Sequence, residues 1–244
     1  MLQVCLNGPR TAADSAVVPL SPAALAASAR QAVAAGAEEV HVHPKTPCGQ
    51  DSLSPQVVGP VLEALRAAVD VPVGVTTGAW AEPDPPRPDG RGGYLDRRVE
   101  RIRAWTVLPD YASVNWHEPG AEEVAAALLD RGVGVEAGLW SGTDGADRFA
   151  RSPLAPRVLR ILAEVMGVAA ASASAAAQEL LTAVAGAGCG RPVLLHGQDA
   201  STWPVLRLAR RLGLDARIGI EDTLTLPDGS RADGNDQLVR AALA

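Results

Sequence analysis

Cysteine is scarce in this chain of 244 residues: Cys5, Cys48 and Cys189 are odd in number and widely spaced. Such a set does not build a disulfide scaffold and is typical of a reducing compartment. Long apolar runs are missing, and the first residues show no basic segment followed by an apolar one. We therefore expect a cytoplasmic protein with no signal peptide and no membrane association.

A surplus of basic residues is also absent. The chain has 22 lysines and arginines against 28 aspartates and glutamates, which gives a formal net charge of −6 at pH 7. Nucleic acids and membrane surfaces require a basic face, so we expect neither as a partner. The C-x-x-C, G-x-S-x-G and P-loop signatures are missing, and no G-x-G-x-x-G follows the first apolar segment. Ser-His-Asp catalysis therefore has no sequence support, and the missing glycine-rich fingerprint disfavours an open doubly wound sheet.

What the chain does contain is an alternation of short apolar segments with longer helical ones. We expect strands at residues 2–6, 39–43, 72–77, 111–115, 133–137, 157–166, 192–196 and 216–220. We expect helices at residues 21–35, 54–69, 94–106, 120–131, 144–150, 172–186, 200–212 and 235–243. Segment 157–166 is ambiguous, and its place in the series favours a strand. Parallel strands need crossover helices, so eight such units predict one (β/α)8 TIM-barrel domain over residues 1–244, with an open doubly wound sheet as the alternative.

Residues 82–93, with four prolines and three glycines, are expected to form a loop. The loop follows the third expected strand, on the face where TIM barrels carry their active sites. This position makes it a candidate lid over a site.

The four histidines, His41, His43, His117 and His196, all lie at or just past the end of an expected strand. In a barrel these ends meet at one mouth. His41 and His43 are two residues apart on a strand, so their imidazoles point to the same face and can share one metal ion. The alternative is a pair of hydrogen-bonded polar residues at a strand end.

A pair of carboxylates ends the eighth expected strand, which neighbours the first strand in a closed barrel. Glu221 can therefore reach a metal ion held by His41 and His43. Two histidines and one carboxylate form a catalytic zinc set, because a coordination position stays open. The alternative for both Glu221 and Asp222 is a helix cap or a salt bridge with Arg217, and for Asp222 it explains the residue as well as a catalytic role does.

Further polar residues are expected on neighbouring strand ends at the same mouth: Asn7, Thr76, Thr77, Ser113, Asn115 and Glu136. Ser113 and Asn115 share one strand face, and Glu136 requires a partner if it faces the barrel interior. Turn chemistry explains each hydroxyl or amide taken alone. Their convergence favours a binding site.

Taken together, these residues resemble the β-keto acid cleavage enzymes. The resemblance rests on the Ala-Gly-Ala-Glu-Glu-Val-His-Val-His run at 35–43, Thr-Thr-Gly at 76–78, and Glu136. It also rests on Arg217, the Gly-Ile-Glu-Asp run at 219–222, and Asn235. These features follow the order of the family from the second strand to the last helix.

The resemblance implies a tetrameric TIM barrel that binds zinc through His41, His43 and Glu221. The family converts a β-keto acid and acetyl-CoA into acetoacetate and a new acyl-CoA. Its substrate-activating pair corresponds to Arg217 and Asp222. Other positions of the family correspond to Thr76 or Thr77, Ser113 or Asn115, and Glu136, while Asn7, His117 and His196 are additional candidates for substrate contacts.

Zinc would polarise the keto oxygen, and cleavage of the carbon–carbon bond needs negative charge to be stabilised there. Arg217 would lower the pKa of Asp222 or anchor the carboxylate of the keto acid. Two alternatives are a metal-dependent hydrolase of the amidohydrolase type and a ligand-binding barrel without catalysis. The first is disfavoured because it places H-x-H on strand one and further histidines on strands five and six.

Overall fold

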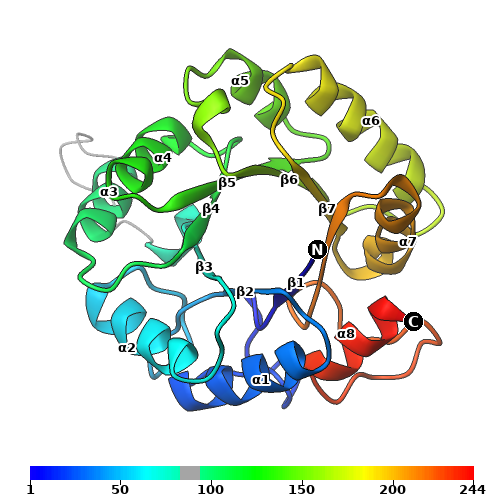
Figure 1. Ribbon diagram of the computed structural model, residues 1–244, viewed down its shortest axis with the longest axis horizontal. Helices are drawn as coiled ribbons and strands as arrows, with labels where there is room; N and C mark the ends of the chain where they lie inside the picture. Colours follow the sequence, from blue (N-terminus) through cyan, green and yellow to red (C-terminus); the bar gives the residue numbers. More distant parts are fainter. Residues whose placement is uncertain (83–93) are drawn as a thin grey trace.

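The computed structural model describes residues 1–82 and 94–244, and the side chains of residues 94–96 are outside that description. Within these ranges, eight parallel strands close into a barrel in chain order, with helices on the outside (Figure 1). The (β/α)8 barrel predicted from the sequence is confirmed. The candidate lid, residues 82–93, lies outside the described residues except for Glu82.

The strands are short and largely buried, and each of them carries at least one buried polar side chain beside its apolar ones. They are β1 (Leu2–Cys5), β2 (Glu39–Val42), β3 (Val73–Thr76), β4 (Tyr111–Asn115), β5 (Gly134–Trp140), β6 (Arg160–Val165), β7 (Val193–Gly197) and β8 (Asp215–Ile218). β5 runs three residues further than expected. In the ambiguous segment a 3₁₀ turn ends at Arg157, so β6 begins only at Arg160.

Each crossover between neighbouring strands contains a helix. The helices are α1 (Pro22–Ala34), α2 (Pro55–Arg66), α3 (Tyr94–Ala104), α4 (Ala121–Asp130), α5 (Gly145–Arg151), α6 (Ala173–Gly186), α7 (Thr202–Leu212) and α8 (Asn235–Leu243). The start of α1 shows how the sequence sets such a boundary: Ser21 accepts a hydrogen bond from Ala24 N, and Pro22 occupies the first helical position. α8 packs beside α1 and closes the ring of helices (Figure 1).

A polar layer fills the barrel near the starts of the strands. Glu136 accepts hydrogen bonds from Gln3 Nε2 (2.8 Å) and Arg160 Nε (2.7 Å). The Tyr111 hydroxyl accepts from Gln3 Nε2 at 3.1 Å, and Arg160 also pairs with Glu39. Burial raises the pKa of Glu136 although Arg160 opposes the shift. The layer is therefore a connected hydrogen-bond network that stabilises the barrel at the N-terminal ends of its strands.

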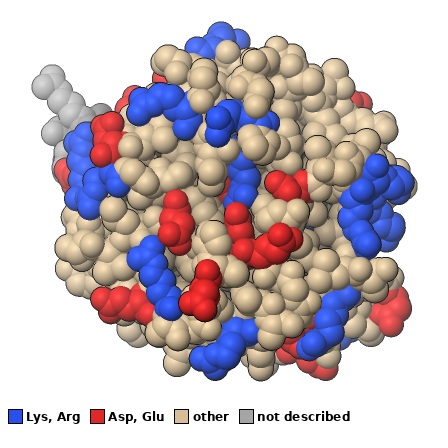
Figure 2. Space-filling model, in the orientation of Figure 1, with Lys and Arg blue, Asp and Glu red and all other residues tan. Residues whose placement is uncertain are grey.

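Charge on the molecular surface is mixed in sign. Figure 2 shows acidic and basic atoms side by side over one face, with a group of basic atoms over α7. That helix carries Arg210 and Arg211 in its last turn. No helix within residues 1–82 and 94–244 is long and apolar enough to span a bilayer.

Candidate active site

Three side chains at the C-terminal ends of the strands bring metal-binding atoms together. His41 lies within β2, His43 follows it directly, and Glu221 follows β8. One ligand atom from each residue lies within 4.8 Å of the other two, and all three residues are buried. β1 pairs with β2 on one side and β8 on the other, so the carboxylate must cross β1 to meet the histidines.

Two glycines allow this crossing. A Cβ atom at Gly219 would overlap the backbone carbonyl of Cys5, so the chain after β8 can lie directly against β1 only without a side chain there. Gly8 has a φ of +57°, and a Cβ at this position would overlap the side chain of Glu221. The carboxylate thus passes over the end of β1 and places Oε1 3.5 Å from His43 Nε2.

The donor set fits a divalent metal ion. His41 Nδ1 and Glu221 Oε2 are buried and have no hydrogen-bond partner among the described residues. Buried polar atoms are nearly always paired, so two unpaired atoms in one cluster indicate a ligand from outside the chain. Two imidazoles and one carboxylate hold such an ion while leaving a position for substrate.

Asp51 orients His43 from the second layer of the site. Its carboxylate accepts hydrogen bonds from His43 Nδ1 (3.1 Å) and Trp80 Nε1 (2.9 Å), and it pairs with Lys45. Asn7 adds a second restraint, because its amide exchanges two hydrogen bonds of 2.9 Å with the backbone of His43. With Nδ1 engaged by a carboxylate, Nε2 is the nitrogen that faces the site.

Replacing Asp51 by asparagine is expected to weaken metal binding about 10–100-fold, because the ring of His43 loses its charged partner. Titration of the metal-free protein against a chelating dye would measure the dissociation constant. Asp236→Asn is a matched control, since Asp236 makes an exposed contact with Arg240 on α8. Equal metal affinities for the two variants would contradict the role assigned to Asp51.

The electrostatics of the metal-free site differ among the three donors. Burial lowers the pKa of His41 well below its ordinary value, so this ring is neutral and ready to bind. Burial would raise the pKa of Glu221, but Arg217 and the histidines lower it well below its usual range. Burial opposes a charge on His43, yet Glu221 and Asp51 raise its pKa to about 9. Metal binding must therefore displace a proton from His43.

We expect metal affinity to increase with pH for this reason. The pKa of His43 is about 9, so at lower pH its ring is protonated in the metal-free protein and the metal ion competes with a proton. The dissociation constant should fall about tenfold for each pH unit gained below that value, and level off above it. Chelator competition at several pH values would measure the slope. A dissociation constant that does not change with pH would contradict the expectation.

Arg217 binds both carboxylates of the β8 loop. Its Nη2 lies 2.7 Å from Glu221 Oε1 and 2.8 Å from Asp222 Oδ1, and its Nε lies 3.1 Å from the same Asp222 oxygen. The salt bridge considered from the sequence is therefore present. Because Nε and Nη2 are engaged by these carboxylates, the geometry favours Arg217 as the residue that positions them.

These residues line a cavity of about 630 Å³ at the barrel mouth, which we refer to as the metal cavity because the His41–His43–Glu221 donor cluster borders it. Nine of the residues expected from the sequence border it: His41, His43, Thr76, Ser113, Asn115, His196, Arg217, Glu221 and Asp222. They come from strands of the barrel or from the residues just past them. A cavity of this size with several polar groups converging on it is a typical small-molecule site.

A family model described as beta-keto acid cleavage enzyme (BKACE) matches residues 1–244. The chain belongs to the beta-keto acid cleavage enzyme family. The resemblance carried by the H-x-H and Gly-Ile-Glu-Asp runs is thereby confirmed. A search of curated proteins gives no match.

Solved structures similar to this BKACE chain share its fold at low sequence identity. ObcA in a ternary complex with a C4-CoA adduct and oxalate is 15% identical, with a TM-score of 0.70. ObcA in a binary complex with oxaloacetate is 15% identical, with a TM-score of 0.68. Both comparisons cover 93% of this chain and 63% of the ObcA chain, so the present chain spans under two thirds of that protein. An N-acetylmannosamine-6-phosphate 2-epimerase from Clostridium perfringens is 12% identical, with a TM-score of 0.53, covering 91% and 87%.

Four predicted site residues of this BKACE member do not border the metal cavity. Asn7 holds the backbone of His43, and the Thr77 hydroxyl donates to the carbonyl of Ser113 at 2.7 Å. His117 packs against Trp140, with ring centroids 4.5 Å apart. Glu136 lies in the polar layer with Gln3 and Arg160, while Trp140, four residues along β5, reaches the cavity instead.

Sequence reasoning missed Glu164, which borders the cavity from β6. Its Oε2 lies 3.0 Å from His196 Nε2, and its Oε1 accepts from Trp140 Nε1 at 3.0 Å. His196 Nδ1 in turn faces Asp222 Oδ1 at 3.3 Å. Burial and Arg217 would lower the pKa of His196, but Asp222 and Glu164 raise it. An acidic residue inside the otherwise apolar run at residues 161–165 was the signal that could have revealed Glu164.

Proposed function

We propose that this chain is a zinc-dependent enzyme that transfers the acyl group of a β-keto acid to coenzyme A. A β-keto acid, R–CO–CH₂–COO⁻, and acetyl-CoA would give the acyl-CoA R–CO–SCoA and acetoacetate. The observation that supports this proposal most strongly is the cluster of His41, His43 and Glu221, which borders the same cavity as Arg217 and Asp222. The ObcA complexes with oxaloacetate and with a C4-CoA adduct are consistent with this chemistry.

Zinc held by His41, His43 and Glu221 would supply Lewis acidity to the keto oxygen. Side chains of the protein itself would carry out the other steps of the reaction. Asp222 is fully buried, borders the cavity and is held by Arg217, which makes it the base for a proton on the carbon between the two carbonyl groups. Held in this way, the carboxylate keeps one orientation towards the substrate.

Two hydroxyl groups form a site for the substrate carboxylate. Thr76 and Ser113 are register partners on β3 and β4, and both border the cavity. Thr76 Oγ1 accepts a hydrogen bond from Gly78 N, so its own proton is available to donate. Two neighbouring O–H groups can donate to the two oxygens of a carboxylate and hold the reacting carbon near Asp222.

The hydrolase alternative receives no support from the site. The described strands β5 and β6 carry no histidine, and the donors come from β2 and β8. We also infer, from the family resemblance, a single-domain chain that forms a homotetramer in the cytoplasm. Light scattering should then give a mass of four times the 25.1 kDa chain.

The decisive experiment incubates the zinc-loaded protein with acetyl-CoA and a panel of β-keto acids that carry aliphatic, polar, cationic or aromatic side chains. We expect acetoacetate and one new acyl-CoA in equal amounts, with loss of activity after chelation and recovery after zinc is added back. Acetoacetate without consumption of acetyl-CoA, or no acyl-CoA from any member of the panel, would rule out the proposed reaction.

A further inference from the structure

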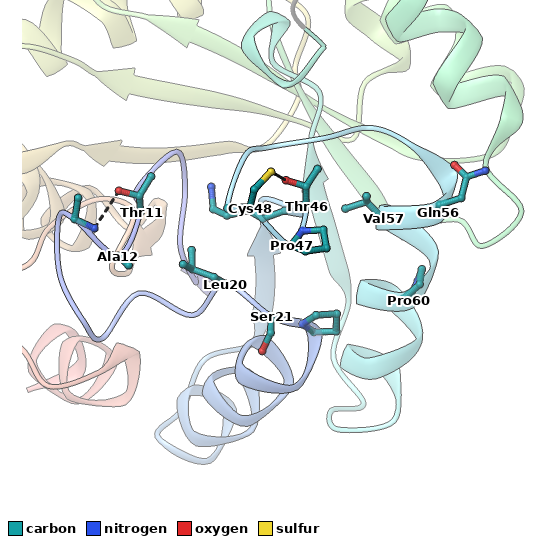
Figure 3. A pocket seen from close by; sticks show the side chains of 14 residues that line it. Thr11, Ala12, Leu20, Ser21, Thr46, Pro47, Cys48, Gln56, Val57 and Pro60 are labelled. Carbon is teal, nitrogen blue, oxygen red and sulfur yellow. Dashed lines mark hydrogen bonds between the residues drawn. The ribbon is translucent and has the colours of Figure 1, made fainter.

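Two further cavities lie near the metal cavity. One of them shares lining residues with it, and the other does not. The first, of about 670 Å³, is enclosed by the β1–α1 loop, the β2–α2 loop and the starts of α1 and α2 (Figure 3). We refer to it as the loop cavity. The second, of about 400 Å³, lies along α6 and is bordered by Ser141, Met166, Val168, Ala176, Leu180 and Ala183, among others. We refer to it as the α6 groove.

The α6 groove adjoins the metal cavity. Trp140, Ser141 and Met166 border both spaces. Trp140 is anchored from the metal-cavity side, where its indole N–H donates to Glu164 at 3.0 Å. A ligand lying in the groove would therefore enter the metal cavity past Trp140 and Met166, directly beside the reacting groups.

We propose that the α6 groove binds the pantetheine arm of the acyl-CoA, an inference that rests on the proposed function. The arm is an uncharged aliphatic chain with two amide groups and ends in the thioester. Glu179 is the one ionisable side chain among the described residues that border the groove, and the others are apolar, hydroxyl-bearing or glycine. A neutral lining of this kind matches the arm, whereas the phosphates of the nucleotide end would remain outside the groove.

Ser141 supplies a specific contact for an amide of the arm. Its Oγ accepts a hydrogen bond from Met166 N at 3.1 Å, so its own proton is free to donate. Thr143 differs, because its hydroxyl donates to the Trp140 carbonyl at 2.9 Å and accepts from Gly145 N. Ser141 stands where groove and metal cavity adjoin, so its O–H fits the amide carbonyl nearest the thioester.

The loop cavity is separated from the metal cavity by side chains. None of its lining residues borders the metal cavity. Lys45 lines it and pairs with Asp51, which holds His43 on the other side. Figure 3 shows Cys48 directed towards Thr46, its hydrogen-bond partner, within the same loop. The Lys45–Asp51 ion pair therefore lies between the loop cavity and His43, so an arm placed in the loop cavity would be separated from the metal cavity.

The two cavities allow a matched test by filling each with the same side chain. Ala176→Trp fills the α6 groove, and Val57→Trp fills the loop cavity, with both positions half-buried on a helix. In the wild type, calorimetric titration should show binding of CoA, and pantetheine should compete with it. We expect Ala176→Trp to weaken CoA binding and raise KM for acetyl-CoA by about tenfold or more. Metal content and KM for the keto acid should stay unchanged, and Val57→Trp should match the wild type.

The outcomes separate this proposal from the reaction on which it rests. If Val57→Trp loses CoA binding and Ala176→Trp keeps it, or if both keep it, the groove assignment is overturned while the reaction stands. If the wild type itself binds no CoA, both the groove and the proposed reaction are wrong. Ala183→Trp, at an exposed position two turns along α6, repeats the test should Ala176→Trp fail to fold.

Discussion

Replacing Glu221 by alanine is expected to remove the metal ion and to lower kcat/KM by at least about 1,000-fold. The change deletes one of three buried donors, and two imidazoles alone leave the ion without an anionic ligand. It also deletes the group that reaches His43 across β1. Elemental analysis of the purified protein measures the result directly: about one zinc per chain in the wild type, and almost none in the variant.

Glu164→Gln is the matched control for this experiment. Glu164 is also a buried carboxylate that borders the cavity, but its oxygens face His196 and Trp140 and it is outside the donor cluster. We expect this variant to retain the full metal content. Retention of zinc by Glu221→Ala, or equal loss from both variants, would show that the metal is held elsewhere.

Replacing Arg217 by methionine is expected to lower the free energy of unfolding of the metal-free protein by about 3–5 kcal/mol. Arg217 is buried, and its removal leaves the carboxylates of Glu221 and Asp222 without their shared cation. Thermal unfolding should show a decrease in Tm of roughly 10 °C. Zinc should restore part of the lost stability, because the ion neutralises Glu221.

Arg240→Met is the control for the loss of an arginine. Arg240 pairs with Asp236 within α8, and its side chain is 63% exposed. Removing an exposed pair of this kind changes stability by less than about 1 kcal/mol. Equal destabilisation by the two substitutions would contradict the view that Arg217 compensates buried charge. Full activity of Arg217→Met would contradict its role in holding Asp222.

Two geometric rules made much of the site predictable. The i, i+2 spacing on a strand fixes a shared face, so His41 and His43 could be paired from their positions in the chain. Barrel closure makes β8 a neighbour of β1, which brought Glu221 within reach of them. The alternation of strands and helices predicted the barrel in the same way, even through the ambiguous segment that contains β6.

Depth along the barrel axis could not be read from the sequence. Glu136 and Trp140 share one face of β5, yet only Trp140 borders the cavity. Alternation predicts which side chains point inward, but the layer that each one joins depends on the stagger of all eight strands. Asp51 and Trp80 were missed for a related reason: both lie outside the strands, and only the folded chain brings them to His43 and to each other.

The crossing of Glu221 over β1 has a mechanical consequence. The histidines lie in the first fifth of the chain and the carboxylate in the last tenth, and β1 stands between them as the strand where the barrel closes. An ion bound by His41, His43 and Glu221 would link β2 to β8 across β1, where the barrel closes. Separation of β8 from β1 would break the coordination, so metal release and opening of the barrel become linked equilibria. The ion would then protect the two ends of the chain from local unfolding as well as serve the reaction.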